Sequence, residues 1–152
     1  MPEAEIGCTD EKYIVFSILD RLYTIPAAFI GEVAMFDKVY PLPLMPPFVL
    51  GIINRYSVPH ALFDIGLMLF GSRSSEGKIL VLKDSIDRAA FLVDDVKDIA
   101  QVPKEKLIRT ARESEQDGER TDAVSASFEW NGSEVLVLDV PYILLRAADG
   151  AA

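Results

Sequence analysis

The chain contains few of the residues on which metal binding and redox chemistry depend. Its 152 residues include one cysteine, Cys8, and one histidine. A single cysteine excludes an intrachain disulfide, which favours a reducing compartment. One His and one Cys leave no H-x-x-H or C-x-x-C spacing for a zinc site. The sequence therefore predicts no metal centre and no disulfide framework.

The signatures of nucleotide binding and nucleophilic catalysis are also missing. Neither G-x-x-x-x-G-K, G-x-G-x-x-G nor G-x-S-x-G occurs. Ser57, His60 and Asp64 are residue types of a catalytic triad. On an extended strand, however, Ser57 and His60 point to opposite faces, and His60 and Asp64 lie too far apart to hydrogen-bond. We therefore expect no catalytic residues, no cofactor and no enzymatic activity.

Charge and hydropathy exclude further classes of protein. The formal net charge is -9, which disfavours binding to nucleic acid or to an anionic membrane surface. Proline, glycine or charge interrupts the longest apolar stretches well short of a membrane span. The polar N-terminal tail, residues 1–11, lacks the apolar region of a signal peptide. We expect a cytoplasmic protein with no nucleic-acid partner and no membrane insertion.

What the chain does contain is β structure. Short runs rich in β-branched and aromatic residues are separated by turn residues, and this pattern predicts strands. The sequence Asn131-Gly132 between two such runs is typical of a tight hairpin. Residues 66–70 fit a short helix or a strand end, and residues 141–148 fit a closing helix. We therefore predict an all-β fold with short helices, including one at the C-terminus.

Two short sequences occur twice, in the same order. Ile-Leu-Asp-Arg at 18–21 is matched by Ser-Ile-Asp-Arg at 85–88, and Ala-Leu-Phe-Asp-Ile at 61–65 by Leu-Val-Leu-Asp-Val at 136–140. A small polar linker, 71–77, separates the copies. This repetition indicates two β-barrels of about five strands, at 12–70 and 78–146. Either alone would bury little apolar surface, so we expect a shared interface.

Without catalytic signatures, the sequence favours a binding module. The strands within 48–65 are joined by a polar corner, Asn54-Arg55-Tyr56-Ser57, whose amide, guanidinium and phenol suit it to contacting a partner. Further candidate surfaces are the edge at 30–32, the proline-rich loop at 37–47 and the bend at 94–99. Each has a structural alternative, since Ile30 also fits the core, Glu32 a solvated strand and the corner a plain turn.

The chain resembles the CheW-like family of chemotaxis coupling proteins. The resemblance rests on YIVFSILDRLYTIP at 13–26, PPFVLGIIN at 46–54, FLVDDVKDI at 91–99 and EVLVLDVPYIL at 134–144. It implies two SH3-like barrels with a hydrophobic seam between them, and no catalysis. It further implies a cytoplasmic adaptor that links the tips of chemoreceptors to the regulatory domain of a CheA-type histidine kinase.

The resemblance also implies receptor- or kinase-binding residues: Ile30, Glu32, Gly51, Asn54, Arg55, Tyr56, Asp94, Val96 and Ile99. The chain departs from the family at the corner, where the usual N-L-R-G is Asn54-Arg55-Tyr56-Ser57, and at Asp95, where the family has glycine. Ser57 tolerates positive φ less well than glycine does. An alternative function is a small-molecule-sensing or scaffold module of a non-chemotactic two-component pathway. A sensing module would use the seam as an apolar cleft, walled by the proline-rich loop and Tyr40.

Overall fold

The computed structural model describes residues 10–36, 38–71, 77–109 and 123–151. Most of the predicted N-terminal tail, residues 72–76 of the linker and residues 110–122 lie outside this part. The strands are β1 (Asp10–Ile18), β2 (Arg21–Pro26), β3 (Ile30–Met35), β4 (Val49–Arg55), β5 (Val58–Asp64), β6 (Lys78–Leu82), β7 (Ala89–Val93), β8 (Asp95–Pro103), β9 (Ile108–Arg109), β10 (Val124–Trp130) and β11 (Ser133–Leu138). The helices are α2 (Ile65–Phe70) and α4 (Val140–Ala151), with 3-10 turns η1 (Ala27–Phe29) and η2 (Lys104–Lys106).

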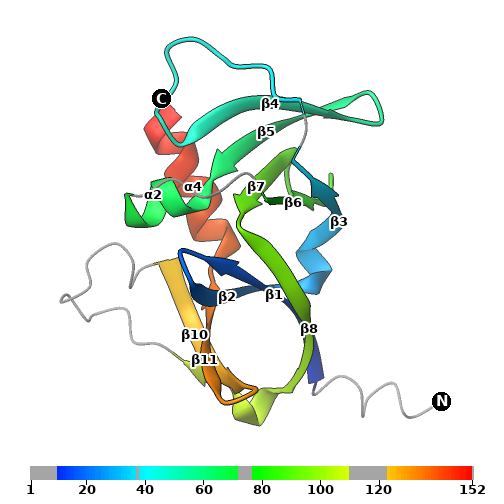
Figure 1. Ribbon diagram of the computed structural model, residues 1–152, viewed down its shortest axis with the longest axis vertical. Helices are drawn as coiled ribbons and strands as arrows, with labels where there is room; N and C mark the ends of the chain where they lie inside the picture. Colours follow the sequence, from blue (N-terminus) through cyan, green and yellow to red (C-terminus); the bar gives the residue numbers. More distant parts are fainter. Residues whose placement is uncertain (1–9, 37, 72–76, 110–122, 152) are drawn as a thin grey trace.

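The strands form two sheets, stacked one above the other in Figure 1. One has the order β8-β1-β2-β11-β10-β9, and the other β3-β6-β7-β5-β4. The predicted all-β class with two SH3-like units and short helices is therefore confirmed. The hydrogen-bonded orders are open, however, so each unit is a curled sheet and not the closed barrel that we expected.

The sheets also correct the predicted division of the chain at 71–77. The β1–β2 hairpin comes from the first half of the sequence but pairs with β8 and β11 of the second half. In return, the β6–β7 hairpin pairs with β3 and β5 of the first half. Each sheet therefore combines strands from both halves. Because the two halves are similar, a hairpin that pairs with the other half meets strands equivalent to those of its own half.

The strand registers show how closely the two halves correspond. Without β9, the first sheet has the order β8-β1-β2-β11-β10. The strands at the same places in the second sheet are β3, β6, β7, β5 and β4. The parallel pair Leu136–Tyr23 has its counterpart in Ala61–Ala89. The register shifts between β10 and β11 at the same place as between β4 and β5. The topology thus agrees with an internal duplication.

The repeated aspartates have the same role in both halves. The side chain of Asp64 accepts a hydrogen bond from the Leu67 N–H at 3.1 Å, and that of Asp139 accepts one from the Tyr142 N–H at 3.1 Å. An aspartate in this position satisfies a backbone donor in the first turn of a helix. Each repeated sequence therefore ends a strand and begins a helix.

Apolar side chains form three clusters. One lies inside each sheet: Tyr13, Val15, Val102 and Phe128 belong to the first, and Ile53, Leu62, Ile79 and Leu92 to the second. The third and largest fills the seam between the sheets and includes buried residues of both helices. The predicted hydrophobic seam is thus present, but it is packed with side chains and is not an open cleft. No helix in the described part of the chain has the length and apolar character needed to cross a membrane.

Candidate partner-binding surface

An ion pair connects β3 to the end of β4. The Arg55 Nε donates to Glu32 Oε1 at 3.2 Å, and Arg55 Nη2 donates to Glu32 Oε2. Two parallel bonds of this kind fix the guanidinium in one orientation. The hydrogen bond that Arg55 donates to Glu32 is also the main reason that the pKa of Arg55 is raised. Two residues 23 positions apart in the sequence therefore form one pre-oriented polar unit.

Tyr56 stands next to this ion pair, in the turn that joins β4 and β5. Its ring lies 5.4 Å from the guanidinium carbon of Arg55, a cation–π distance, and the residue is 84% exposed. Tyr56 and Ser57 have φ values of 53° and 67°, as in a two-residue hairpin turn. Asn54, just before Arg55, is also exposed. The predicted corner therefore presents an aromatic ring on a tight turn.

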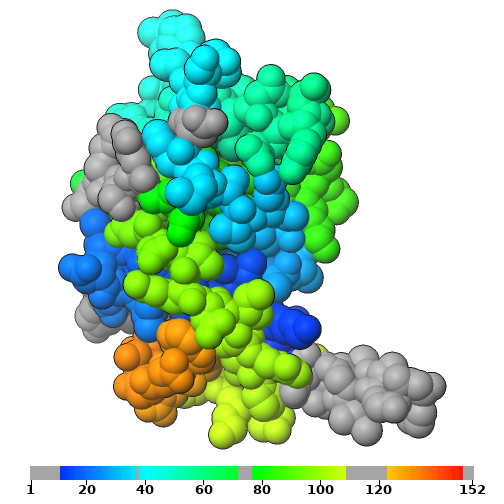
Figure 2. All heavy atoms as spheres, turned by 45° about the vertical axis from the view of Figure 1, so that its right-hand side comes forward, coloured from blue at the N-terminus to red at the C-terminus, as the bar shows by residue number. Residues whose placement is uncertain are grey.

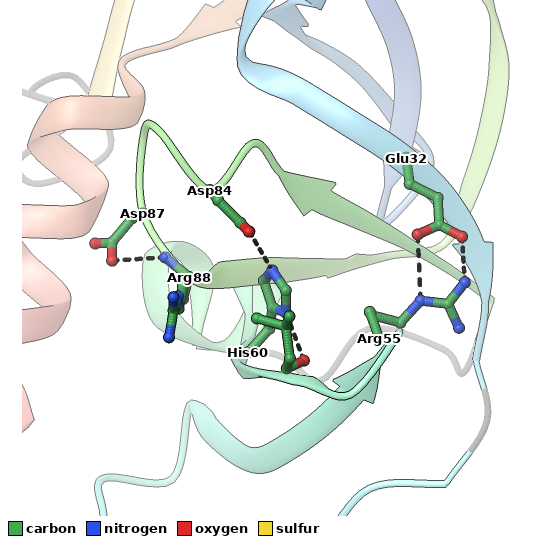
Figure 3. A network of polar contacts seen from close by, with 7 residues as sticks. Glu32, Arg55, His60, Asp84, Asp87 and Arg88 are labelled. Atoms are coloured by element: carbon green, nitrogen blue, oxygen red, sulfur yellow. Dashed lines mark hydrogen bonds and ion pairs between the residues drawn. The ribbon is translucent and has the colours of Figure 1, made fainter.

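The ion pair and Tyr56 line a hollow of about 240 Å³ whose other wall is the β6–β7 turn, with Lys83 and Asp84. Beneath it lies His60, which is 3% exposed. Its Nε2 lies 3.2 Å from Asp84 Oδ1, and its Nδ1 lies 3.1 Å from the Val58 carbonyl oxygen. Figure 3 shows both contacts beside the Glu32–Arg55 pair.

Sequence reasoning missed this side of the site. Asp84 meets His60 across 24 positions of sequence, and no local spacing indicates such a contact. The acid next to His60 is therefore Asp84, whereas Asp64 caps α2. No group of three or more His, Cys, Asp or Glu residues is placed to hold a metal ion among the residues that the structure describes.

A second group of predicted residues, Asp94, Val96 and Ile99, lies just before β8 and along its first half. Asp94 Oδ2 accepts the Leu19 N–H at 2.8 Å, and the Asp94 N–H donates to the Ser17 carbonyl at 3.0 Å. Val96 packs against the seam, whereas Ile99 is 59% exposed. Figure 2 turns this side forward, with light-blue β3 above yellow-green β8. Of these three residues, Ile99 is the one with a largely exposed apolar side chain.

Asp95, between Asp94 and Val96, bridges two lysines. Its Oδ1 lies 3.1 Å from Lys78 Nζ, and its Oδ2 lies 3.6 Å from Lys97 Nζ. The hydrogen bond from Lys78 is the main cause of a lowered pKa at Asp95. The residue that replaces the family glycine thus ties β8 to β6.

Two predicted binding residues are buried. Ile30 is 9% exposed and belongs to the seam cluster. Gly51 is also buried, at φ 145°, and a Cβ there would collide with the carbonyl group of Tyr40. Ile30 and Gly51 therefore support the fold and offer a partner little side-chain surface, and their role in partner binding stays a prediction.

Two SH3-like units that exchange hairpins across an apolar seam define a class of all-β domains. Within this class, the family model described as CheW-like domain matches residues 12–148, so the chain belongs to the CheW-like domain family. Among solved structures, the fold is similar to the crystal structure of the scaffolding protein TtCheW from Thermoanaerobacter tengcongensis. That match has a TM-score of 0.75 and 18% identity, and it covers 86% of this chain and 84% of that chain. No curated protein matches the chain.

Proposed function

We propose that the chain is a non-catalytic adaptor that couples the cytoplasmic tip of a chemoreceptor to the regulatory domain of a CheA-type histidine kinase. The observation that carries this proposal is the family match over residues 12–148, nearly all of the described fold. The similar structure of TtCheW, itself a scaffolding protein, supports the same role. The adaptor would work in the cytoplasm, where receptor tips and kinase meet.

The corner at Asn54, Arg55 and Tyr56 supplies the features that a partner interface needs. Interfaces depend on a few aromatic and arginine anchors more than on total area. Tyr56 is such an aromatic anchor. Because Glu32 already holds Arg55 in the free protein, Arg55 loses less conformational entropy when a partner binds. We assign the principal contact to this corner and a second, apolar contact to Ile99 on β8.

Isothermal titration calorimetry with two purified ligands tests the proposal. The ligands are the helical tip fragment of a receptor and the kinase regulatory domain, both encoded in the same genome as this chain. We expect Tyr56→Ala to weaken binding of at least one ligand about tenfold or more, the loss typical of an aromatic anchor. Arg55→Glu should weaken it as well, because it places a second carboxylate beside Glu32.

Leu145→Ala is the matched control, because Leu145 is 66% exposed but lies on α4, away from the corner. Its affinity should equal that of the wild-type chain. If neither ligand binds the wild-type chain, the adaptor role is wrong. If both bind but neither the Tyr56 nor the Arg55 variant changes the affinity, the adaptor uses a different surface.

A further inference from the structure

A second hollow, on the α4 side of the molecule, has an apolar lining. It measures about 210 Å³ and lies between the proline-rich loop (Leu42, Met45), strands β5 and β7 (Phe63, Ala89) and helix α4 (Leu144, Ala147). In Figure 1 the cyan segment before β4 passes above the C-terminal end of α4. We call this hollow the α4 groove. A cavity of roughly 150 Å³ is enough to hold a benzene ring, so the groove has room for one aromatic ring and a short polar end.

The other half of the molecule shows why the side chains leave a hollow here. Ala61 and Ala89, which line it, are register partners on β5 and β7. The corresponding partners in the other sheet are Leu136 and Tyr23. There the Tyr23 ring stacks on Phe70 of α2, with centroids 5.3 Å apart. The pair on β5 and β7 thus consists of two alanines, whereas the equivalent pair on β11 and β2 consists of a leucine and a tyrosine. The side-chain volume that the alanines lack corresponds to an aromatic side chain.

The rim of the groove carries one charge of each sign. Asp87 and Arg88 both line it and both are exposed. The Arg88 backbone N–H donates to Asp87 Oδ1 at 2.8 Å, which orients the carboxylate. Figure 3 shows the two side chains leaving the β6–β7 turn in different directions. Within the described residues, neither side chain has an ion-pair partner.

We infer that the α4 groove binds a free α-amino acid with an aromatic side chain. The ring occupies the space that Tyr23 fills in the other half. The α-carboxylate meets the guanidinium of Arg88, and the α-ammonium meets the carboxylate of Asp87. A zwitterion has no net charge, so the net charge of -9 does not repel it as it would repel a simple carboxylate. This binding activity goes beyond the proposed adaptor role.

Calorimetry with L-phenylalanine, 3-phenylpropionate and 2-phenylethylamine tests the inference on the full chain. The second compound lacks the ammonium group and the third lacks the carboxylate. We expect saturable one-to-one binding of L-phenylalanine, and binding of the other two at least about tenfold weaker because each loses a charge-assisted contact. In a 15N-labelled sample, the amide signals of Ala89, Leu144 and Ala147 should shift with the same affinity.

Arg88→Gln and Asp87→Asn should each weaken L-phenylalanine binding by about tenfold or more. Both residues are exposed, so the fold should tolerate the changes. Arg21→Gln is the control, because Arg21 is also exposed but lies on β2, outside the lining of the groove; it should bind normally. No saturable binding at millimolar L-phenylalanine would overturn the inference. Equal binding of 3-phenylpropionate, or unchanged affinity in the Arg88 variant, would overturn it as well.

Discussion

At the scale of single residues, β3 shows how a bulge separates two neighbours. By simple alternation, Ile30 and Glu32 would share one face of the strand. The register with β6 shifts between them, however, so that Ile30 pairs with Leu82 and Glu32 with Val81. A bulge redirects side chains, and here Ile30 packs in the seam while Glu32 reaches Arg55. Ile30 therefore stabilises the fold, whereas Glu32 belongs to the candidate partner-binding surface.

Replacing Ile30 tests its assignment to the core. We expect Ile30→Asp to lower the free energy of unfolding by several kcal/mol, about 3 or more, because it places a carboxylate among apolar side chains. Urea unfolding followed by circular dichroism measures the change. Ile99→Asp is the control and should unfold at nearly the wild-type urea concentration, since Ile99 is 59% exposed. An Ile30 variant as stable as the control would mean that this side chain faces solvent.

The contact between Asp95 and Lys78 predicts a pH effect. The pKa of Asp95 is lowered from its ordinary value of 3.8. A carboxylate whose pKa is lower in the folded state stabilises the fold above its unfolded pKa, and this stabilisation is lost as the pH falls through the folded pKa. We therefore expect Asp95→Asn to make the loss of stability below about pH 4 less steep.

NMR titration of the side-chain carboxyl carbon identifies the source of this shift. In Lys78→Gln, the pKa of Asp95 should rise toward its ordinary value, because Lys78 is the main cause of the lowering. Lys97→Gln should change it less, since Lys97 contributes the smallest effect. A larger change in the Lys97 variant than in the Lys78 variant would contradict the assignment.

At the scale of elements, two hairpin turns correspond between the halves. Tyr56-Ser57 joins β4 to β5, and Asn131-Gly132 joins β10 to β11, with positive φ at all four residues. Asn-Gly suits this geometry, whereas serine at the second position is strained. The sequence predicted the Asn131-Gly132 hairpin correctly. The sequence also predicted a corner at Asn54-Arg55-Tyr56-Ser57, but Tyr56-Ser57 lacks the residue types that favour this turn, so the pairing of β4 with β5 imposes its geometry.

Ser57→Gly should therefore stabilise the chain. Relief of the left-handed strain exceeds the extra entropy of glycine in the unfolded chain, so we expect a gain of about 0.5–1 kcal/mol. For a domain of this size the melting temperature should rise by roughly 1–4 °C in scanning calorimetry. Gly132→Ala, at φ 80° in the matching turn, should lower it. A lower melting temperature for Ser57→Gly would show that the serine side chain makes a stabilising contact.

At the scale of the whole molecule, the exchange of hairpins makes the halves interdependent. The first half lacks the β6–β7 hairpin that completes its own sheet, and the second half lacks β1–β2. We expect fragments 10–71 and 77–152 to be unfolded when each is expressed alone, because each leaves sheet edges and the seam exposed. Mixing them should restore dispersed NMR signals in a one-to-one complex. Independent folding of either fragment would contradict this interdependence.

Local patterns in the sequence were sufficient to predict most of the strands (not the two-residue β9), the Asn131-Gly132 turn and the closing helix, because alternation, turn preference and capping act over a few neighbouring residues. The repeated segments also indicated two similar units. Tertiary structure alone decided which hairpin joins which sheet, that Glu32 meets Arg55 and Asp84 meets His60, and that a hollow remains beside α4. Those outcomes depend on burying one shared apolar core between distant segments, and the energy of that burial is not encoded in any short stretch of sequence.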